Sequence, residues 1–216
     1  MLVILDAGHG GIINGQYVTP GKRSPVWSDG SQLFEGEFNR AIVEGLSERL
    51  TARGIQNVKL VPEQQDIDLP TRMQRANQYA DQPSIFISVH ANAGGGNGFE
   101  VFTSVGTTLS DTLAHCFGEA FKQEFPDRRL RADMADGDYD KDKNYFVLKH
   151  TRMPAVLTEN FFMDTEEECR GILMSNEGRQ RIIRYHEHAV LAFLQNQTGV
   201  SSPQTAQVRP PDRQGK

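Results

Sequence analysis

Short apolar runs alternate with longer segments of helical spacing along most of this chain, and no other feature constrains its fold as strongly. The runs have the continuous apolar character of strands that are buried on both faces of a sheet. We expect strands at 2–5, 58–61, 84–89, 99–102 and 155–157, and a further extended segment at 144–148. We expect helices at about 38–54, 70–79, 109–121, 166–174 and 177–195. The alternation predicts an α/β fold, a single domain with a mostly parallel twisted sheet of about six strands and helices on both faces.

The last predicted helix contains two of the six histidines. Its buried stripe passes through Ile182, through His186 or Val190, and through Phe193, and Asn176 is placed to cap its first turn. His186 and His188 face different sides of this helix, and the H-E-x-x-H spacing of a zinc protease is absent. We therefore expect both histidines to be structural or exposed.

The last twenty residues, 197–216, differ in composition from the rest of the chain. They are rich in Pro, Gln and Ser, and their clearly apolar side chains are Val200, Ala206 and Val208. Burial of so few apolar groups does not offset the entropy lost on ordering. We predict a folded domain over 1–196 and a disordered polar tail or linker over 197–216.

The charge balance and the N-terminus narrow the choice of partners and location. The 23 Lys and Arg residues against 28 Asp and Glu give a net charge of −5, which argues against nucleic acid as a partner. No apolar run approaches the ~20 residues of a membrane span. No basic residue precedes Lys22, so no signal peptide is visible, and we expect synthesis in the cytoplasm. The two cysteines, Cys116 and Cys169, are not in a CxxC pair and are expected to be buried thiols.

Polar side chains follow three of the predicted strands at the point where each strand ends. His9 follows the first strand among three glycines, His90 ends the third, and Glu159 follows the strand after Pro154. Open α/β sheets bind ligands at the carboxyl ends of their parallel strands, so these side chains should meet at one edge. Two imidazoles and a carboxylate there predict a catalytic zinc site of the His₂Glu kind.

The carboxylate of this ligand set is left open by the spacing. Glu159 is one candidate, and Glu35 and Glu37, at the entry of the first long helix, are two others. Asp6 is a candidate to orient a ligand histidine from behind, although a role in the turn at the strand end explains it equally well.

Four motifs around these residues give the chain a resemblance to a known family. They are ILDAGHGG at Ile4–Gly11, FEGEFN at Phe34–Asn39, FISVHANA at Phe86–Ala93 and MPAVLTENFFM at Met153–Met163. In this order and spread they resemble the zinc-dependent N-acetylmuramoyl-L-alanine amidases of the amidase-3 type, over residues 1 to about 195. The chain departs from the family's usual pattern at Ala7, where Pro is common, and at Asn160-Phe161, where Thr-Gly or Ser-Gly is typical.

The resemblance implies the roles of individual residues. His9, Glu35 and His90 would hold one zinc ion, and Glu159 would be the catalytic glutamate. Glu35 is favoured over Glu37 because the family's ligand glutamate stands four residues before an Asn, here Asn39. The Asp-rich segment 127–143 resembles a family-variable insertion, and we expect it to be a solvated surface loop.

The implied reaction is hydrolysis of the amide between N-acetylmuramic acid and L-alanine in peptidoglycan. The alternatives are a zinc carboxypeptidase or deacetylase, and a cell-wall-binding module without hydrolytic activity. The loop from Ile12 to Leu33 lies between two proposed ligands, and we expect its Trp27, together with Asn92, to contact substrate. We further expect a monomer that reaches the cell wall or periplasm after release, or by another export route.

Overall fold

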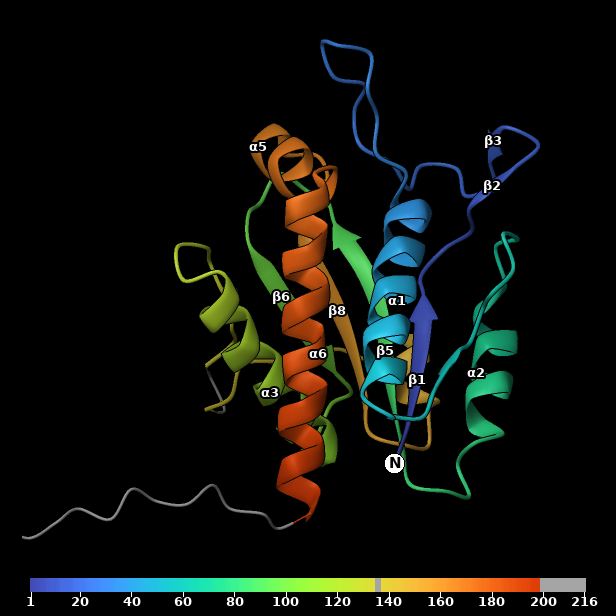
Figure 1. The fold of residues 1–216 in the computed structure, drawn as a ribbon, viewed down its shortest axis with the longest axis vertical. Helices are drawn as coiled ribbons and strands as arrows, with labels where there is room; N and C mark the ends of the chain where they lie inside the picture. The colour runs from blue at the N-terminus through green and yellow to red at the C-terminus, as the bar shows by residue number, and fades with distance from the viewer. Residues whose placement is uncertain (135–136, 199–216) are drawn as a thin grey trace, which may run out of the picture.

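A six-stranded sheet runs through the middle of the protein, seen here in a computed structural model that describes residues 1–134 and 137–198 (Figure 1). Its strands are β1 (Leu2–Ala7), β4 (Asn57–Lys59), β5 (Ser84–Asn92), β6 (Phe99–Thr103), β7 (Lys141–Asp142) and β8 (Ala155–Phe162), in the order β4-β1-β5-β8-β6-β7. Neighbours from β4 to β8 are parallel, whereas β6 is antiparallel to β8 and parallel to β7. The predicted mostly parallel α/β sheet is confirmed. A separate hairpin pairs β2 (Ile12–Ile13) with β3 (Gln16–Tyr17).

Helices cover both faces of this sheet. They are α1 (Glu35–Ala52), α2 (Leu69–Asn77), α3 (Leu109–Glu124), α4 (Phe146–Lys149), α5 (Glu166–Glu168) and α6 (Asn176–Thr198), with a π-helical turn at Cys169–Leu173 after α5. Alternate residues of each strand point to opposite faces. Val3 and Leu5 of β1 therefore join the core formed with α1, α3 and α6, while Leu2 and Ile4 join the smaller core formed with α2 and α4.

Some predicted elements are wrong in detail. Residues 144–148 were expected to be extended, but Phe146–Lys149 forms a helical turn that buries the adjacent Val147 and Leu148 together. Adjacent residues of a strand would point to opposite faces, so a helical turn is needed to bury both on one side. Asn176 does not cap α6: it is the first residue of the helix, and Oγ of Ser175 accepts from the N–H of Gly178 over 3.0 Å.

The residues that the structure describes end with helix α6. Helix α6 continues to Thr198, beyond the predicted boundary at 196, and residues 199–216 of the predicted tail lie outside the described residues. Cys116 and Cys169 are buried free thiols, as expected. Among the described residues, no helix combines the length and the apolar content that crossing a membrane requires.

Candidate metal centre

The four residues implied by the sequence meet at the carboxyl edge of the sheet. His9 follows β1, His90 lies near the end of β5, and Glu159 is its direct neighbour in the register of β8. Glu35 comes from a different element, the first turn of α1, whose N-terminus points at the same edge (Figure 1). Parallel strands thus bring together side chains that are as much as 150 positions apart in the sequence.

His9, Glu35 and His90 form a group that could hold a metal ion, with one ligand atom from each lying within 4.8 Å of the others. Oε1 of Glu35 is 3.1 Å from Nε2 of His9 and 3.0 Å from Nδ1 of His90. A tetrahedral zinc ion with ligands ~2.0–2.1 Å away separates its donor atoms by roughly 3.3 Å, so the spacing fits zinc. Nε2 of His9 is buried and faces Oε1 of Glu35, so two of the three donor atoms already lie against each other, as ligands of one ion do.

The structure separates the three carboxylates that the sequence left open. Only Glu35 belongs to the group with both histidines among the described residues. Glu37, two residues on, points elsewhere: its Oε1 accepts from the N–H of Ile12 over 3.1 Å and anchors the following loop. Glu159 lies beside the group without joining it.

Burial and mutual contacts set the charges of the group. Burial by itself would raise the pKa of Glu35, but hydrogen bonds and charge interactions with His9 and His90 hold this pKa well below its usual range. Desolvation lowers the pKa of His9. Desolvation also opposes charge on His90, yet Glu35, Glu159 and Asp6 together raise its pKa. The centre therefore keeps an ionised carboxylate between two imidazoles, which suits a divalent cation.

Glu159 differs from the carboxylate next to it. Burial raises the pKa of Glu159 to about 7, and its Oε2 has no hydrogen-bond partner among the described residues. Its antiparallel register partner, Glu100, lies 2.5 Å from Arg131 and 2.6 Å from Lys141, and these contacts lower the pKa of Glu100 although burial opposes this. Glu100 thus stays ionised and paired with two cations, whereas Glu159 can exchange a proton near neutral pH.

The cations beside Glu100 come from the Asp-rich segment 127–143. This segment was expected to be a solvated loop, but Asp140 is buried and its Oδ2 accepts from Oγ1 of Thr103 over 2.5 Å. Arg131 and Lys141 reach the strand next to Glu159. The prediction of a merely solvated loop is wrong for these residues, because Asp140 is buried and the two cations pair with Glu100, the register partner of Glu159.

His9 and a residue close to Glu159 in the sequence have an unusual backbone conformation. His9 and Phe161 both have positive φ, 67° and 58°, which is uncommon for residues other than glycine. Phe161 stands where the resembled family typically has glycine, and its buried ring packs 5.0 Å from Phe125. Beside it, Nδ2 of Asn160 donates to the carbonyl of His90 over 2.8 Å. The unusual Asn160-Phe161 pair therefore combines core packing with a hydrogen bond to the backbone of His90.

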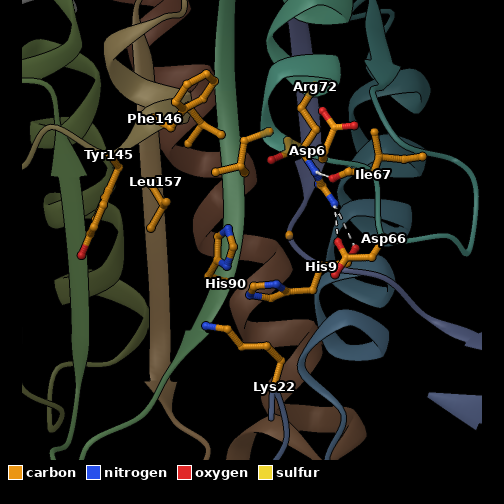
Figure 2. A pocket seen from close by; sticks show the side chains of 14 residues that line it. Asp6, His9, Lys22, Asp66, Ile67, Arg72, His90, Tyr145, Phe146 and Leu157 are labelled. Atoms are coloured by element: carbon orange, nitrogen blue, oxygen red, sulfur yellow. Dashed lines mark hydrogen bonds and ion pairs between the residues drawn. The ribbon is translucent and has the colours of Figure 1, made fainter. Parts of the chain in front are cut away.

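A cavity of about 640 Å³ opens next to the histidines (Figure 2). Lys22 reaches into it toward His9 and His90, and its ammonium has no ion-pair partner among the described residues. The opposite wall contains the half-exposed rings of Tyr145 and Phe146. The cavity thus combines a free cation with an apolar wall beside the metal centre.

Neither of the two residues expected to contact substrate lines this cavity. Trp27 is half-buried and packs against the main core. Asn92 donates from Nδ2 to Oε2 of Glu100 over 2.8 Å and accepts from the N–H of Ala93. Trp27 was the predicted substrate contact in the loop 12–33, whereas the residue of this loop that lines the cavity is Lys22.

The comparisons with known proteins agree on one family. The model of the Amidase_3 family, described as N-acetylmuramoyl-L-alanine amidase, matches residues 3–191. The endolysin of Bacillus phage SPP1 is 30% identical over 206 residues, covering 94% of this chain and 70% of that protein. The N-acetylmuramoyl-L-alanine amidase CwlM of Bacillus licheniformis is 30% identical over 197 residues, covering 87% of this chain and 66% of that protein. This chain therefore spans about two thirds of the length of these two relatives.

A solved structure shows the same fold. The N-acetylmuramoyl-L-alanine amidase from Clostridium difficile 630 superposes with a TM-score of 0.71 at 24% identity, covering 89% of this chain and 96% of that one.

Proposed function

Since this chain belongs to the Amidase_3 family, it is an N-acetylmuramoyl-L-alanine amidase acting on peptidoglycan, and we propose that one zinc ion at His9, Glu35 and His90, with Glu159 as proton carrier, performs the cleavage. The observation that carries the proposal is the convergence of three donor atoms within 4.8 Å beside a carboxyl group whose pKa is about 7. Zinc bound there would lower the pKa of a coordinated water and polarise the amide carbonyl.

Glu159 serves as general base and then as general acid in this proposal. A group with a pKa near the working pH both accepts and returns a proton readily. Its unpartnered Oε2 takes a proton from the attacking water and delivers it to the departing L-alanine nitrogen. Glu100 stays paired with Arg131 and Lys141 and takes no part in this transfer.

Substrate lies in the cavity beside the histidines. The apolar wall at Tyr145 and Phe146 suits the face of a sugar, and the free ammonium of Lys22 suits a carboxylate of the stem peptide. Trp27 and Asn92 remain proposed substrate contacts, although neither lines this cavity. Unchanged saturation by peptidoglycan in Trp27→Ala would remove Trp27 from this set.

The direct test of the proton carrier is Glu159→Gln, measured on purified peptidoglycan together with the zinc content. We expect retained zinc and fold, with activity lower by ~10²–10⁴-fold. Glu37→Gln is the matched control, because a Gln oxygen can still accept from Ile12, and it should stay active. Near-normal hydrolysis by Glu159→Gln would reject the assignment.

Metal content tests the ligands. His90→Ala should lose zinc, whereas His188→Ala, an exposed histidine on α6, should keep it. Stoichiometric zinc in His90→Ala would exclude His90 as a ligand.

Product analysis separates this reaction from those of a carboxypeptidase or a deacetylase. A muramoyl amidase releases peptides with a new L-alanine amino terminus and leaves the glycan intact. We further propose that the protein acts as a monomer and reaches the wall by release or by another export route, as its likeness to a phage endolysin suggests. Sedimentation of the protein alone tests the first of these points.

A further inference from the structure

Three buried polar side chains behind the metal centre form a chain of hydrogen bonds that ends on His90. Arg72, Asp6 and Ser88 are 2%, 1% and 0% exposed. Nη1 of Arg72 donates to Oδ1 of Asp6 over 2.6 Å, and Oγ of Ser88 donates to Oδ2 of Asp6 over 2.7 Å. The same Oγ lies 3.1 Å from Nε2 of His90. None of the three is a proposed ligand or proton carrier, so the reaction alone does not account for their burial.

The donors and acceptors in this row of hydrogen bonds can be assigned in only one consistent way. The Asp6 carboxylate, paired with Arg72, can only accept, so it takes its hydrogen bonds from both neighbours. The single hydroxyl proton of Ser88 is used on Asp6, and Ser88 therefore presents a lone pair to His90. Nε2 of His90 must then carry the ring proton. When a metal ion takes the place of the 3.0 Å contact between Nδ1 and Oε1 of Glu35, Nδ1 then offers the lone pair that the metal requires.

Arg72 also holds the other histidine through the backbone. Its guanidinium donates to the carbonyl of Ala7 over 2.7 Å and to that of His9 over 3.1 Å. These bonds support the turn in which His9 has its positive φ of 67°. Figure 2 shows Arg72 beside Asp6, above the two histidine rings. One buried cation thus connects to both histidines, to His9 directly and to His90 through Asp6 and Ser88.

We propose that Asp6, Ser88 and Arg72 are positioning residues that fix His90 in its Nε2-protonated tautomer and thereby raise the affinity of the centre for zinc. The inference rests on the proposed function only in taking zinc as the bound ion. Outer hydrogen-bond partners of metal-ligating histidines typically change metal affinity by ~10–100-fold.

Two variants test this proposal in different ways. In Asp6→Asn the amide can donate to Ser88, so the Ser88 hydroxyl is free to donate to Nε2 of His90 and the ring proton moves to Nδ1. Ser88→Ala removes the acceptor but leaves the buried ion pair of Arg72 and Asp6 intact. Ser84→Ala is the control, because it deletes a buried serine of the same strand whose Oγ bonds to the carbonyls of Tyr79 and Gln82.

Two measurements are made on each protein. The dissociation constant for Zn²⁺ is measured by competition with a chelator. The tautomer of His90 is read from the ¹⁵N shifts of its ring in metal-free protein, at alkaline pH where the imidazole is neutral. For this measurement every protein, the wild-type reference included, also carries Glu35→Ala, because the carboxylate 3.0 Å from Nδ1 would otherwise compete for the ring proton. We expect zinc binding to weaken by ~10–100-fold in Asp6→Asn and by ~10-fold in Ser88→Ala, with Ser84→Ala at the wild-type value. Wild type should show the proton on Nε2, and Asp6→Asn should show it on Nδ1.

The outcomes separate this inference from the proposed function. Wild-type zinc affinity in Ser88→Ala, or a wild-type proton on Nδ1, would overturn the positioning role even if the enzyme is a zinc amidase. If Asp6→Asn fails to fold, Ser88→Ala still decides the matter, since its ion pair is untouched. If wild type binds no zinc, the proposed function fails, and the tautomer of the His90 ring still tests the positioning role of Asp6 and Ser88.

Discussion

His186 should make the stability of this protein depend on pH in a predictable way. Its ring is fully buried against Phe117, its Nδ1 donates to the carbonyl of Ile182 over 2.9 Å, and its Nε2 lies 3.1 Å from the hydroxyl of Thr158. Desolvation lowers its pKa from 6.5 to about 4. Between these two values the unfolded chain binds a proton that the native state does not, so stability falls as the pH falls.

The size of this effect follows from the two pKa values. The interval from 6.5 to about 4, at ~1.36 kcal/mol per pH unit, corresponds to about 3 kcal/mol. This stability is fully present above 6.5 and is lost by about pH 4. His186→Gln keeps a donor and an acceptor but does not titrate, so the variant lacks this contribution to the pH dependence.

The assay is urea unfolding of wild type and His186→Gln at about pH 7 and about pH 4. Carboxylates titrate in both proteins, so the difference between their two pH dependences isolates His186. We expect wild type to lose about 3 kcal/mol more than the variant on acidification. Equal losses in the two proteins would show that His186 is not held neutral, and would refute the reasoning.

Three further predictions follow from contacts at the centre and in the core. A Cβ at Gly8 would lie 2.1 Å from Cε1 of His90, so Gly8→Ala should displace that ring and lower the zinc content, while wild-type zinc would show that the ring can move at no cost. Phe161→Ala removes a fully buried ring and should lower the free energy of unfolding by about 3–5 kcal/mol, less any relief of its positive φ; a loss under about 1 kcal/mol in urea unfolding would contradict the packing role. Dialysis against a chelator should abolish hydrolysis of peptidoglycan and added Zn²⁺ should restore it, and activity in demonstrably metal-free protein would rule out the zinc mechanism.

Strand-end positions explain why part of the centre was predictable from sequence. His9, His90 and Glu159 each follow a buried apolar run, and parallel strands place their carboxyl ends at one edge. The direct register pairing of His90 with Glu159 realises that expectation. Glu35 lies on a helix that approaches the edge from outside the sheet, so no strand pattern could select it over Glu37, and only its likeness to the amidase motif favoured it.

Other features of the site had no readable signal. Lys22 and Trp27 occupy the same loop, and nothing local shows that the lysine lines the cavity while the tryptophan packs on the core. The helical turn at Phe146–Lys149 is too short to show helical periodicity in its sequence, and its run of apolar residues favoured a strand.

The sequence alone determined the alternation of strands and helices, and hence an α/β sheet with chemistry at one edge. Period and burial are local properties, legible in any few consecutive residues. The tertiary structure decided which carboxylate joins the histidines and which groups hold them. Arg72 bonds to Asp6 across 66 positions, Ser88 to Asp6 across 82, and His90 contacts Glu35 across 55. Such hydrogen bonds depend on side-chain positions fixed only when distant elements pack together, so no local pattern of residues encodes them.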